Sequence, residues 1–284
     1  MAATLYLIAT PIGNLEDITL RALRILREEA NVIACEDTRQ TQKLLSHYEV
    51  RKPLISYHQH NEALRAGEIL ERLSRGESVA LVSDAGTPLI SDPGYRVVAA
   101  ALAKGYPVVP VPGASAVLAA LTASGLPVIE FRFIGFLPAK TMARRRVLAD
   151  IVHSSSTEVV YESPHRILDS LSDMHEMLGG RQIVLARELT KLHEEFLRGS
   201  ADEIRRMLLQ RSSIKGEITI LIAPLEKKPQ IDDPLSEVHR LEREEGLDRR
   251  GAIKAVAKRF GLPKREVYRL AAEQDSSQRS KDRD

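Results

Sequence analysis

Tryptophan is absent from this 284-residue chain, and aromatic residues together make up only 4% of it. Proteins that bind single-stranded nucleic acids without sequence preference stack bases on aromatic side chains, so we do not expect that binding mode to be the main activity. The single cysteine, Cys35, excludes an internal disulfide and a zinc site built from cysteines. Such sparing use of cysteine is typical of a reducing compartment.

Long apolar segments and a strong net charge are also missing. No apolar run approaches the roughly 20 residues of a membrane span, and the first residues lack the basic leader and apolar core of a signal peptide. We therefore expect a cytoplasmic protein with no membrane partner. The net charge of +2 indicates that any surface for nucleic acid is local.

Repeated strand and helix patterns fill the first part of the chain, and the length suggests about two domains. Each of five short apolar runs is followed by a polar loop and then by a helical pattern. These runs are Leu5–Ala9, Asn31–Cys35, Leu54–Tyr57, Val79–Val82 and Val108–Val111. The repetition predicts a parallel sheet covered by helices, which we place at residues 1–122.

The loop over residues 83–94 is the most conspicuous connection in this domain. It is polar, contains two Gly and two Pro residues between Gly86 and Gly94, and is longer than the roughly 2–6 residues usual for such connections. Loops at the carboxyl ends of parallel strands bind ligands in open α/β folds. Polar clusters follow all five strands, so we expect a ligand site at this edge of the sheet. No G-x-G-x-x-G follows the first strand, which argues against an ordinary dinucleotide-binding fold.

A second domain is expected over residues 123–225, where strands outnumber helices. The predicted strands are Phe131–Phe136, Glu158–Tyr161, Gln182–Ala186, Glu194–Arg198 and Glu217–Ala223. This pattern favours an α+β domain with a mixed sheet.

The rest of the chain divides into a linker, a small helical domain and a tail. Residues 226–236 are rich in Pro and charge, residues 237–274 resemble a helix-turn-helix, and the polar residues 275–284 are expected to be disordered. Between Arg249 and Arg269 there are eight Lys or Arg residues and one Glu. These helices could contact nucleic acid or pack on a partner subunit, and the sequence leaves both open.

Short motifs along residues 4–225 identify a family. They are, in order, IATPIGNLEDIT, ACEDTR, HNE, SDAGTPLISDPG, VPGASA, IGFLP, YESPHR, ARELTK and GEI. The series resembles the ribosomal RNA small subunit methyltransferase I family, and the C-terminal helices resemble the small terminal domain of that family. The resemblance implies a two-domain tetrapyrrole-methylase-like α/β fold with a small helical C-terminal extension.

The same resemblance implies an activity and partners. It implies a homodimer that uses S-adenosylmethionine to methylate the ribose 2′-hydroxyl of a cytidine in the decoding region of 16S rRNA. The substrate is either naked rRNA or the assembled small ribosomal subunit. The cofactor would bind in the cleft between the two α/β domains.

Two loops carry most of the cofactor contacts that the resemblance implies. The predicted cofactor-binding residues are Pro11, Asp84, Gly86, Thr87, Pro88, Gly113, Ala114, Ser115 and Ala116. The wider fold often has Gly-Asp-Pro where this chain has Gly86-Thr87-Pro88. A role for a carboxylate at position 87 therefore cannot be carried over, and Asp84 is the substitute.

Methyl transfer to a ribose hydroxyl requires alignment of the reacting atoms and is helped by a base. The predicted catalytic residues are Asp37, Asn61 and Glu162, with Glu36, Glu188 and His165 as further candidates in the same clusters. His58, His60 and Glu62 could hold a metal, but we predict none, because the chemistry of this fold does not require one.

Local positive charge is expected to bind the RNA. The predicted RNA-binding residues are Arg39, Lys140, Arg144, Arg145, Arg146, Arg166 and Lys191. Two other functions are weighed against this one. A tetrapyrrole-type small-molecule methyltransferase would have no use for basic patches, and a non-enzymatic nucleic-acid-binding regulator would not need five polar loop clusters.

Overall fold

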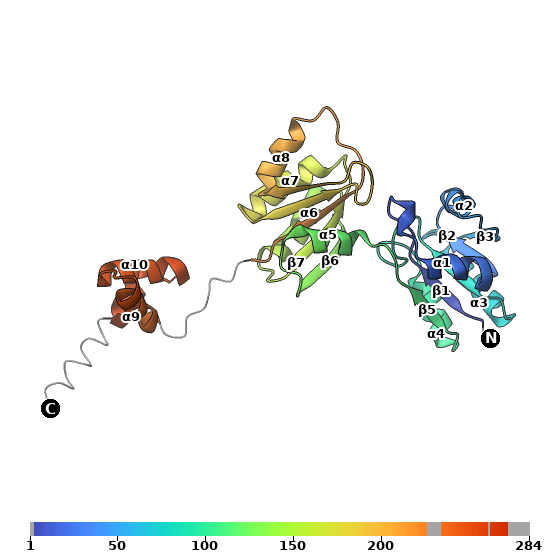
Figure 1. Ribbon diagram of the computed structural model, residues 1–284, viewed down its shortest axis with the longest axis horizontal. Coiled ribbons are helices and arrows are strands. Elements are labelled where there is room, and N and C mark those ends of the chain that lie inside the picture. The colour runs from blue at the N-terminus through green and yellow to red at the C-terminus, as the bar shows by residue number, and fades with distance from the viewer. Residues whose placement is uncertain (1–2, 226–233, 261, 272–284) are drawn as a thin grey trace. The chain divides into compact units, whose positions relative to one another are not determined.

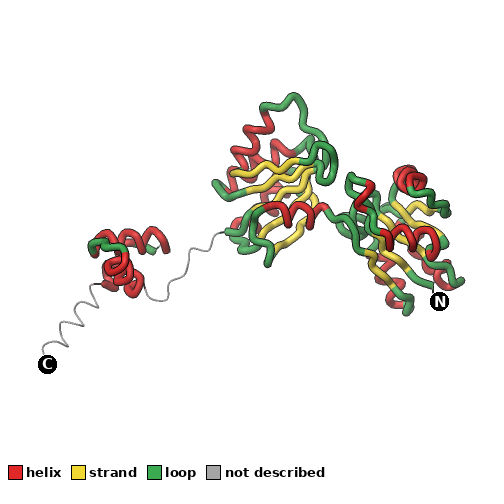
Figure 2. Tube along the Cα trace, viewed as in Figure 1, coloured by secondary structure: helices red, strands yellow, loops and turns green. Residues whose placement is uncertain are grey.

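The computed structural model describes residues 3–225, 234–260 and 262–271 (Figure 1). The chain forms two compact units, Met1–Leu225 and Glu226–Asp284. Figure 2 shows that the first unit contains all the strands drawn in yellow, whereas the second is helical.

A five-stranded parallel sheet forms the first half of the larger unit, as expected. Its order is β3-β2-β4-β1-β5, so β1 lies between the strands whose loops are of most interest. The strands are β1 (Leu5–Ile8), β2 (Val32–Cys35), β3 (Leu54–Ser56), β4 (Val79–Val82) and β5 (Val108–Val111). Every residue of β2 and β4 is buried, because helices cover both faces of a parallel sheet.

The helices of this half alternate with its strands. They are α1 (Leu20–Arg24), α2 (Thr38–His47), α3 (Glu62–Ser74), α4 (Tyr95–Ala103) and α5 (Ala116–Ser124), with a 3₁₀ turn η1 (Leu15–Asp17) and a π-helical turn η2 (Ile25–Glu29). The boundary expected at residues 122 and 123 falls inside α5. That helix ends at Ser124 and is capped by Gly125, whose φ of 78° suits glycine.

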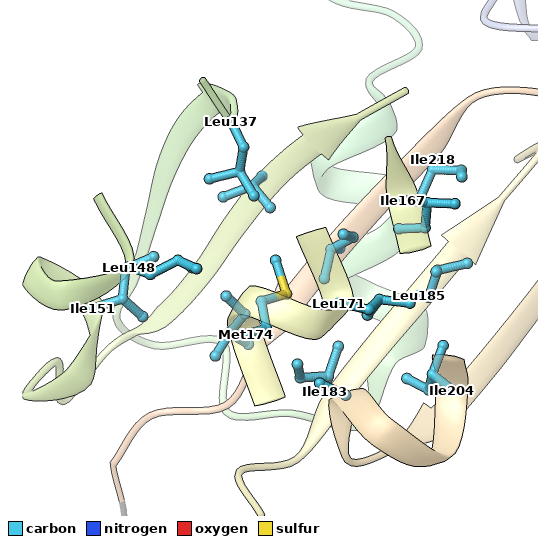
Figure 3. Packing of buried hydrophobic residues seen from close by; sticks show 14 of the residues in the cluster. Leu137, Leu148, Ile151, Ile167, Leu171, Met174, Ile183, Leu185, Ile204 and Ile218 are labelled. Carbon is cyan, nitrogen blue, oxygen red and sulfur yellow. The ribbon is translucent and has the colours of Figure 1, made fainter. Parts of the chain in front are cut away.

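The second half of the larger unit is a mixed sheet of order β6-β7-β10-β8-β9. Only β6 and β7 pair in parallel. Its elements are β6 (Phe131–Phe136), α6 (Thr141–Val152), β7 (Thr157–Glu162), α7 (Ile167–Leu178), β8 (Ile183–Arg187), β9 (Glu195–Gly199), α8 (Ala201–Leu209) and β10 (Ile218–Ile222). Figure 3 shows Leu148, Leu171 and Ile204, from its three helices, meeting strand residues such as Ile183 in one buried cluster.

Helix α5 covers the other face of this mixed sheet. Its residues Val117 and Leu121 belong to a buried cluster with Val159 of β7, Val184 of β8 and Leu221 of β10. Because α5 directly follows the loop after β5, this packing brings the loop edge of the parallel sheet to the mixed sheet. The candidate site forms where the two meet.

The C-terminal unit consists of α9 (Pro234–Glu244), α10 (Arg249–Phe260) and a helix described over residues 264–271. Its core includes Val238, Leu241, Ile253, Val256 and Val267. Helix α9 begins inside the range expected to be a linker, whereas the expected tail lies outside the described residues.

Among the helices that the structure describes, we found none with the length and apolar character to cross a membrane.

Candidate active site

The loops after β1, β4 and β5 are joined by hydrogen bonds. Thr10 and Gly86 pair through both backbone amides, with N–O distances of 2.9 and 3.0 Å. Thr87 Oγ1 donates to the carbonyl of Ala114 at 3.2 Å. Gly86 has a φ of 84°, and a Cβ there would lie 3.3 Å from Ile12, so this close crossing of β1 favours glycine.

A cavity of about 400 Å³ lies between these loops and the mixed sheet. Of the predicted cofactor-binding residues, it is lined by Asp84, Gly86, Thr87, Ser115 and Ala116. Its other wall includes Tyr161 at the end of β7 and Glu217 just before β10. The structure thus brings the two predicted loops together and completes the cavity with residues from the second half of the unit.

The remaining predicted cofactor residues lie near this cavity without lining it. Pro88 is buried, Gly113 packs closely on Ala9, and Ala114 accepts the bond from Thr87. They shape the loops that form the wall.

A second hollow of about 530 Å³ adjoins the first. It contains Pro11 and residues of α2 such as Gln40, and it shares Asp84 and Glu217 with the first cavity. Asp84 also accepts the backbone N–H of Asp37 at 3.0 Å. Asp84 therefore lies on the wall of both hollows.

Asp92 is a cavity residue that the sequence analysis did not single out. Burial, together with the nearby carboxylates of Glu36 and Asp84, raises the pKa of Asp92 to about 6. Across the cavity, burial and the charges of Asp92 and Glu217 raise the pKa of Tyr161 to about 12. Asp92 is therefore a carboxylate that accepts a proton readily near neutral pH.

The backbone around Asp92 is strained. Leu89 and Ser91 have φ values of 73° and 66°, in the left-handed region that residues other than glycine seldom adopt. Each such residue costs about 1–3 kcal/mol and persists where the surrounding structure requires it, often at functional sites. The second Ser-Asp pair of the loop, Ser91-Asp92, was the available sequence signal for this residue.

Asp37 and Asn61, two predicted catalytic residues, are engaged by their own loops. Asp37 caps α2, and its hydrogen bonds to Arg39 hold the pKa of its carboxyl below the usual range. The Asn61 side chain accepts from the His58 N–H at 2.8 Å and donates to the Ser56 carbonyl at 3.1 Å. Neither lines the cavity of Asp92.

Glu162, the third predicted catalytic residue, lines the cavity of Asp92, but its carboxylate is fully buried and already accepts hydrogen bonds from its neighbours. It accepts the Ser163 N–H and a guanidinium N–H of Arg166, both at 2.7 Å, and the Ser170 hydroxyl. Of the further candidates, Glu188 pairs with Lys191, and His165 donates its backbone N–H to Ser163.

The predicted RNA-binding residues are mostly paired with carboxylates. Arg39 pairs with Asp37, Arg166 with Glu162, and Lys191 with Glu188 and Glu217. Arg145 pairs with Asp173 and Glu176. Lys140 and Arg146 are exposed and form no ion pair within the described part of the chain.

Arg144 is not a surface residue, and its assignment to an RNA-binding patch needs correction. Its side chain is 4% exposed and forms an ion pair with Asp173 at 2.5 Å. It lies on the face of α6 that also carries the buried Leu148 and Ile151. We therefore assign Arg144 to the core of the mixed-sheet half.

We expect the substitution Arg144→Met to lower the free energy of unfolding by about 1–3 kcal/mol, because it leaves a buried Asp173 oxygen without its partner. Arg145 still bonds the other oxygen, which limits the loss. RNA affinity should not change. Thermal unfolding and RNA titration check this, and a variant of full stability that loses RNA affinity would restore the surface assignment.

The residues weighed as metal ligands do not gather as a metal site. The rings of His58 and His60 lie 5.9 Å apart between centroids, and the Glu62 carboxylate accepts from Tyr57 and from the Gly94 N–H. Within the described ranges, no group of three or more His, Cys, Asp or Glu residues is placed to hold a metal ion.

Comparison with known proteins identifies the family. Residues 4–205 match the family model described as Tetrapyrrole (Corrin/Porphyrin) Methylases. The chain belongs to the tetrapyrrole methylase family.

Two similar curated proteins carry the same name. The chain is 46% identical over 273 residues to ribosomal RNA small subunit methyltransferase I of Halalkalibacterium halodurans, with 94% of each chain covered. It is 45% identical over 277 residues to the protein of that name from Haemophilus influenzae, covering 95% of this chain and 96% of the relative. These likenesses place the chain in the ribosomal RNA small subunit methyltransferase I family.

Two solved methyl-transfer and synthase structures share the fold of the larger unit. Diphthine synthase superposes with a TM-score of 0.58 at 14% identity, over 78% of this chain and 90% of that one. Cobalt precorrin-4 methyltransferase superposes with a TM-score of 0.57 at 18% identity, over 78% and 94%. At such low identity these structures show the common architecture alone.

Proposed function

We propose that this chain is an S-adenosylmethionine-dependent methyltransferase that methylates the ribose 2′-hydroxyl of a cytidine in the decoding region of 16S rRNA. The observation that carries the proposal is the near full-length similarity to proteins named ribosomal RNA small subunit methyltransferase I. The two adjoining cavities that share Asp84 support it, because a methyltransferase must hold a methyl donor and an acceptor side by side.

The first cavity fits the proposed cofactor in size and in chemistry. Its volume of about 400 Å³ lies in the range of small-molecule sites. The carboxylates of Asp84 and Asp92 suit a positively charged sulfonium, and the Ser115 hydroxyl offers a polar group for the rest of the molecule. When bound there, S-adenosylmethionine supplies an activated methyl group.

The second cavity and Asp92 provide for the acceptor. We propose that the target nucleotide enters the hollow beside α2 and presents its ribose hydroxyl at the edge that Asp84 shares with the first cavity. Asp92 then accepts the hydroxyl proton, which is the role of a positioned base with a pKa near the working pH. Asp37 holds Asp84 in place through its backbone N–H, Glu162 fixes its own part of the cavity wall, and Asn61 stabilises the loop after β3.

Product analysis tests this function directly. The full chain, given S-adenosylmethionine with a labelled methyl group, is expected to label 16S rRNA, and nuclease digestion should release the label as 2′-O-methylcytidine. Naked rRNA and assembled small subunits are offered separately, and a tetrapyrrole serves as the small-molecule alternative. Label on a base, on the tetrapyrrole or on no acceptor would refute the proposal.

We further propose a cytoplasmic homodimer. Light scattering of the purified full chain at several concentrations checks the dimer, and a mass of one chain throughout would contradict it.

A further inference from the structure

Most of the basic residues predicted to bind RNA in the larger unit are already paired with carboxylates. Of the seven basic residues predicted to bind RNA, all but Lys140 and Arg146 have carboxylate partners in the structure. An enzyme that holds a large polyanion needs unneutralised cations. Such cations are found in the C-terminal unit.

Helix α9 of that unit neutralises its own charges. Arg240 bonds Glu237 and Glu244, each at 2.8 Å. Arg249, at the start of α10, approaches Glu242 at 3.7 Å. The carboxylates of α9 are therefore directed to neighbouring cations within the unit.

Helix α10 carries a line of cations with no such partners. Arg250, Lys254 and Lys258, which we call the α10 basic stripe, are all exposed, and no carboxylate of the described residues pairs with any of them. Their spacing of four residues places them along one side of the helix, with a rise of about 6 Å between neighbours. The buried side of α10 contains Ile253 and Val256 instead.

The next helix begins with two more unpaired cations. Lys264 and Arg265 are exposed in the first turn of the helix over 264–271, and neither forms an ion pair with a described residue. Cations at a helix N-terminus oppose the helix dipole, so their position does not serve stability. Tyr268, one turn beyond Lys264, is 37% exposed.

The chemistry of this surface favours RNA over a protein partner. The centre of a protein interface is apolar and depleted in lysine. Among the described residues of this unit, the only large apolar side chains counted as exposed are Leu247 and Tyr268, each at 37%. Evenly spaced cations with one accessible aromatic ring suit a phosphate backbone and an unpaired base.

We infer that the C-terminal unit binds the sugar-phosphate backbone of the RNA substrate through the α10 basic stripe. Lys264 and Arg265 contact further phosphates, and Tyr268 stacks on an unpaired base. That the partner is RNA rests on the proposed function, whereas the location of the binding surface rests on the charges described here.

The test compares two full-length variants with the same change of charge. Lys254→Glu with Lys258→Glu reverses the stripe, and Arg51→Glu with Lys104→Glu reverses two exposed cations of the larger unit. Affinity for a 16S rRNA transcript is measured from low to moderate salt. We expect the stripe variant to bind about tenfold more weakly or worse, and the slope of log affinity against log salt to fall by about 2, since each lost phosphate contact removes about 1.

Two further measurements separate the outcomes. The stripe variant should match the wild-type chain in S-adenosylmethionine affinity and in thermal unfolding. If the Glu variant unfolds, Lys254→Gln with Lys258→Gln is used instead, and the slope of log affinity against log salt should fall by the same amount. Equal RNA affinity in the stripe and control variants would overturn the inference, as would a change in oligomeric mass with RNA binding intact. Methyl transfer by the wild-type chain is scored separately, so a failure of the proposed function is recognised on its own.

Discussion

The substitution Asp92→Asn is expected to lower kcat for methyl transfer by about 10²- to 10⁴-fold, the usual contribution of a positioned base. An amide has nearly the shape of the carboxylate but accepts no proton. Because the Asp92 carboxylate also faces the proposed sulfonium, cofactor affinity should fall as well, so kcat is compared at saturating cofactor. Single-turnover rates and cofactor titration on the full chain measure the two quantities separately.

The pH dependence gives the same prediction a second readout. The pKa of Asp92 is raised to about 6, so the wild-type rate should rise with pH through about 6 and then level off. The Asn variant should lack this rise. The substitution Glu36→Gln, which removes a nearby negative charge, should lower the pKa of Asp92 and move the rise to lower pH with a similar plateau.

Stability should move in the opposite direction to activity. A carboxyl whose pKa is higher in the folded than in the unfolded state destabilises the fold above that pKa and has no effect below the unfolded value. At pH 7 we therefore expect Asp92→Asn to raise the free energy of unfolding by about 1–2 kcal/mol. At pH 3 the gain should vanish. A variant that is destabilised at pH 7, or that keeps its kcat and its pH profile, would show that Asp92 is not the base.

The fold, and the meeting of the loops that we propose to hold the cofactor, could be predicted because their signals are local. Apolar runs such as Val79–Val82 followed by Gly-rich polar loops specify buried parallel strands and their connections with little help from the rest of the chain. The sheet against which α5 packs could not be predicted in this way. The apolar residues of this helix suit either sheet, and only the tertiary structure shows Leu121 packed on the mixed sheet rather than ending the first domain.

The roles of single charged residues depended on partners that are distant in sequence. Arg144 and Arg145 are adjacent, yet Arg144 has the spacing of the buried Leu148 and Ile151 along α6, and Asp173, 29 positions further along, bonds both arginines. The helical spacing of Arg144 with Leu148 and Ile151 indicates that Arg144 is buried, whereas counting the three consecutive arginines as one positive patch does not. The pKa of Asp92 likewise depends on Glu36, which lies after another strand.

The second large effect concerns Glu162, the predicted catalytic residue that the structure places in a buried network. We expect Glu162→Ala to lower the free energy of unfolding by about 3–5 kcal/mol, as when one partner of a buried ion pair is removed. The Arg166 guanidinium, the Ser163 N–H and the Ser170 hydroxyl would all lose their acceptor. Denaturant unfolding of the full chain measures the loss.

Glu162→Gln distinguishes a structural carboxylate from a base. The amide oxygen can still accept one or two of the bonds, so we expect a loss of about 1–3 kcal/mol, with kcat reduced only modestly and its rise near pH 6 preserved. If Glu162 were the proton acceptor, the Gln variant would fold and bind cofactor but lose kcat together with that rise. Asp92→Asn is expected to lose kcat together with the rise near pH 6. Assaying Asp92→Asn and Glu162→Gln side by side therefore shows which of the two carboxylates accepts the proton.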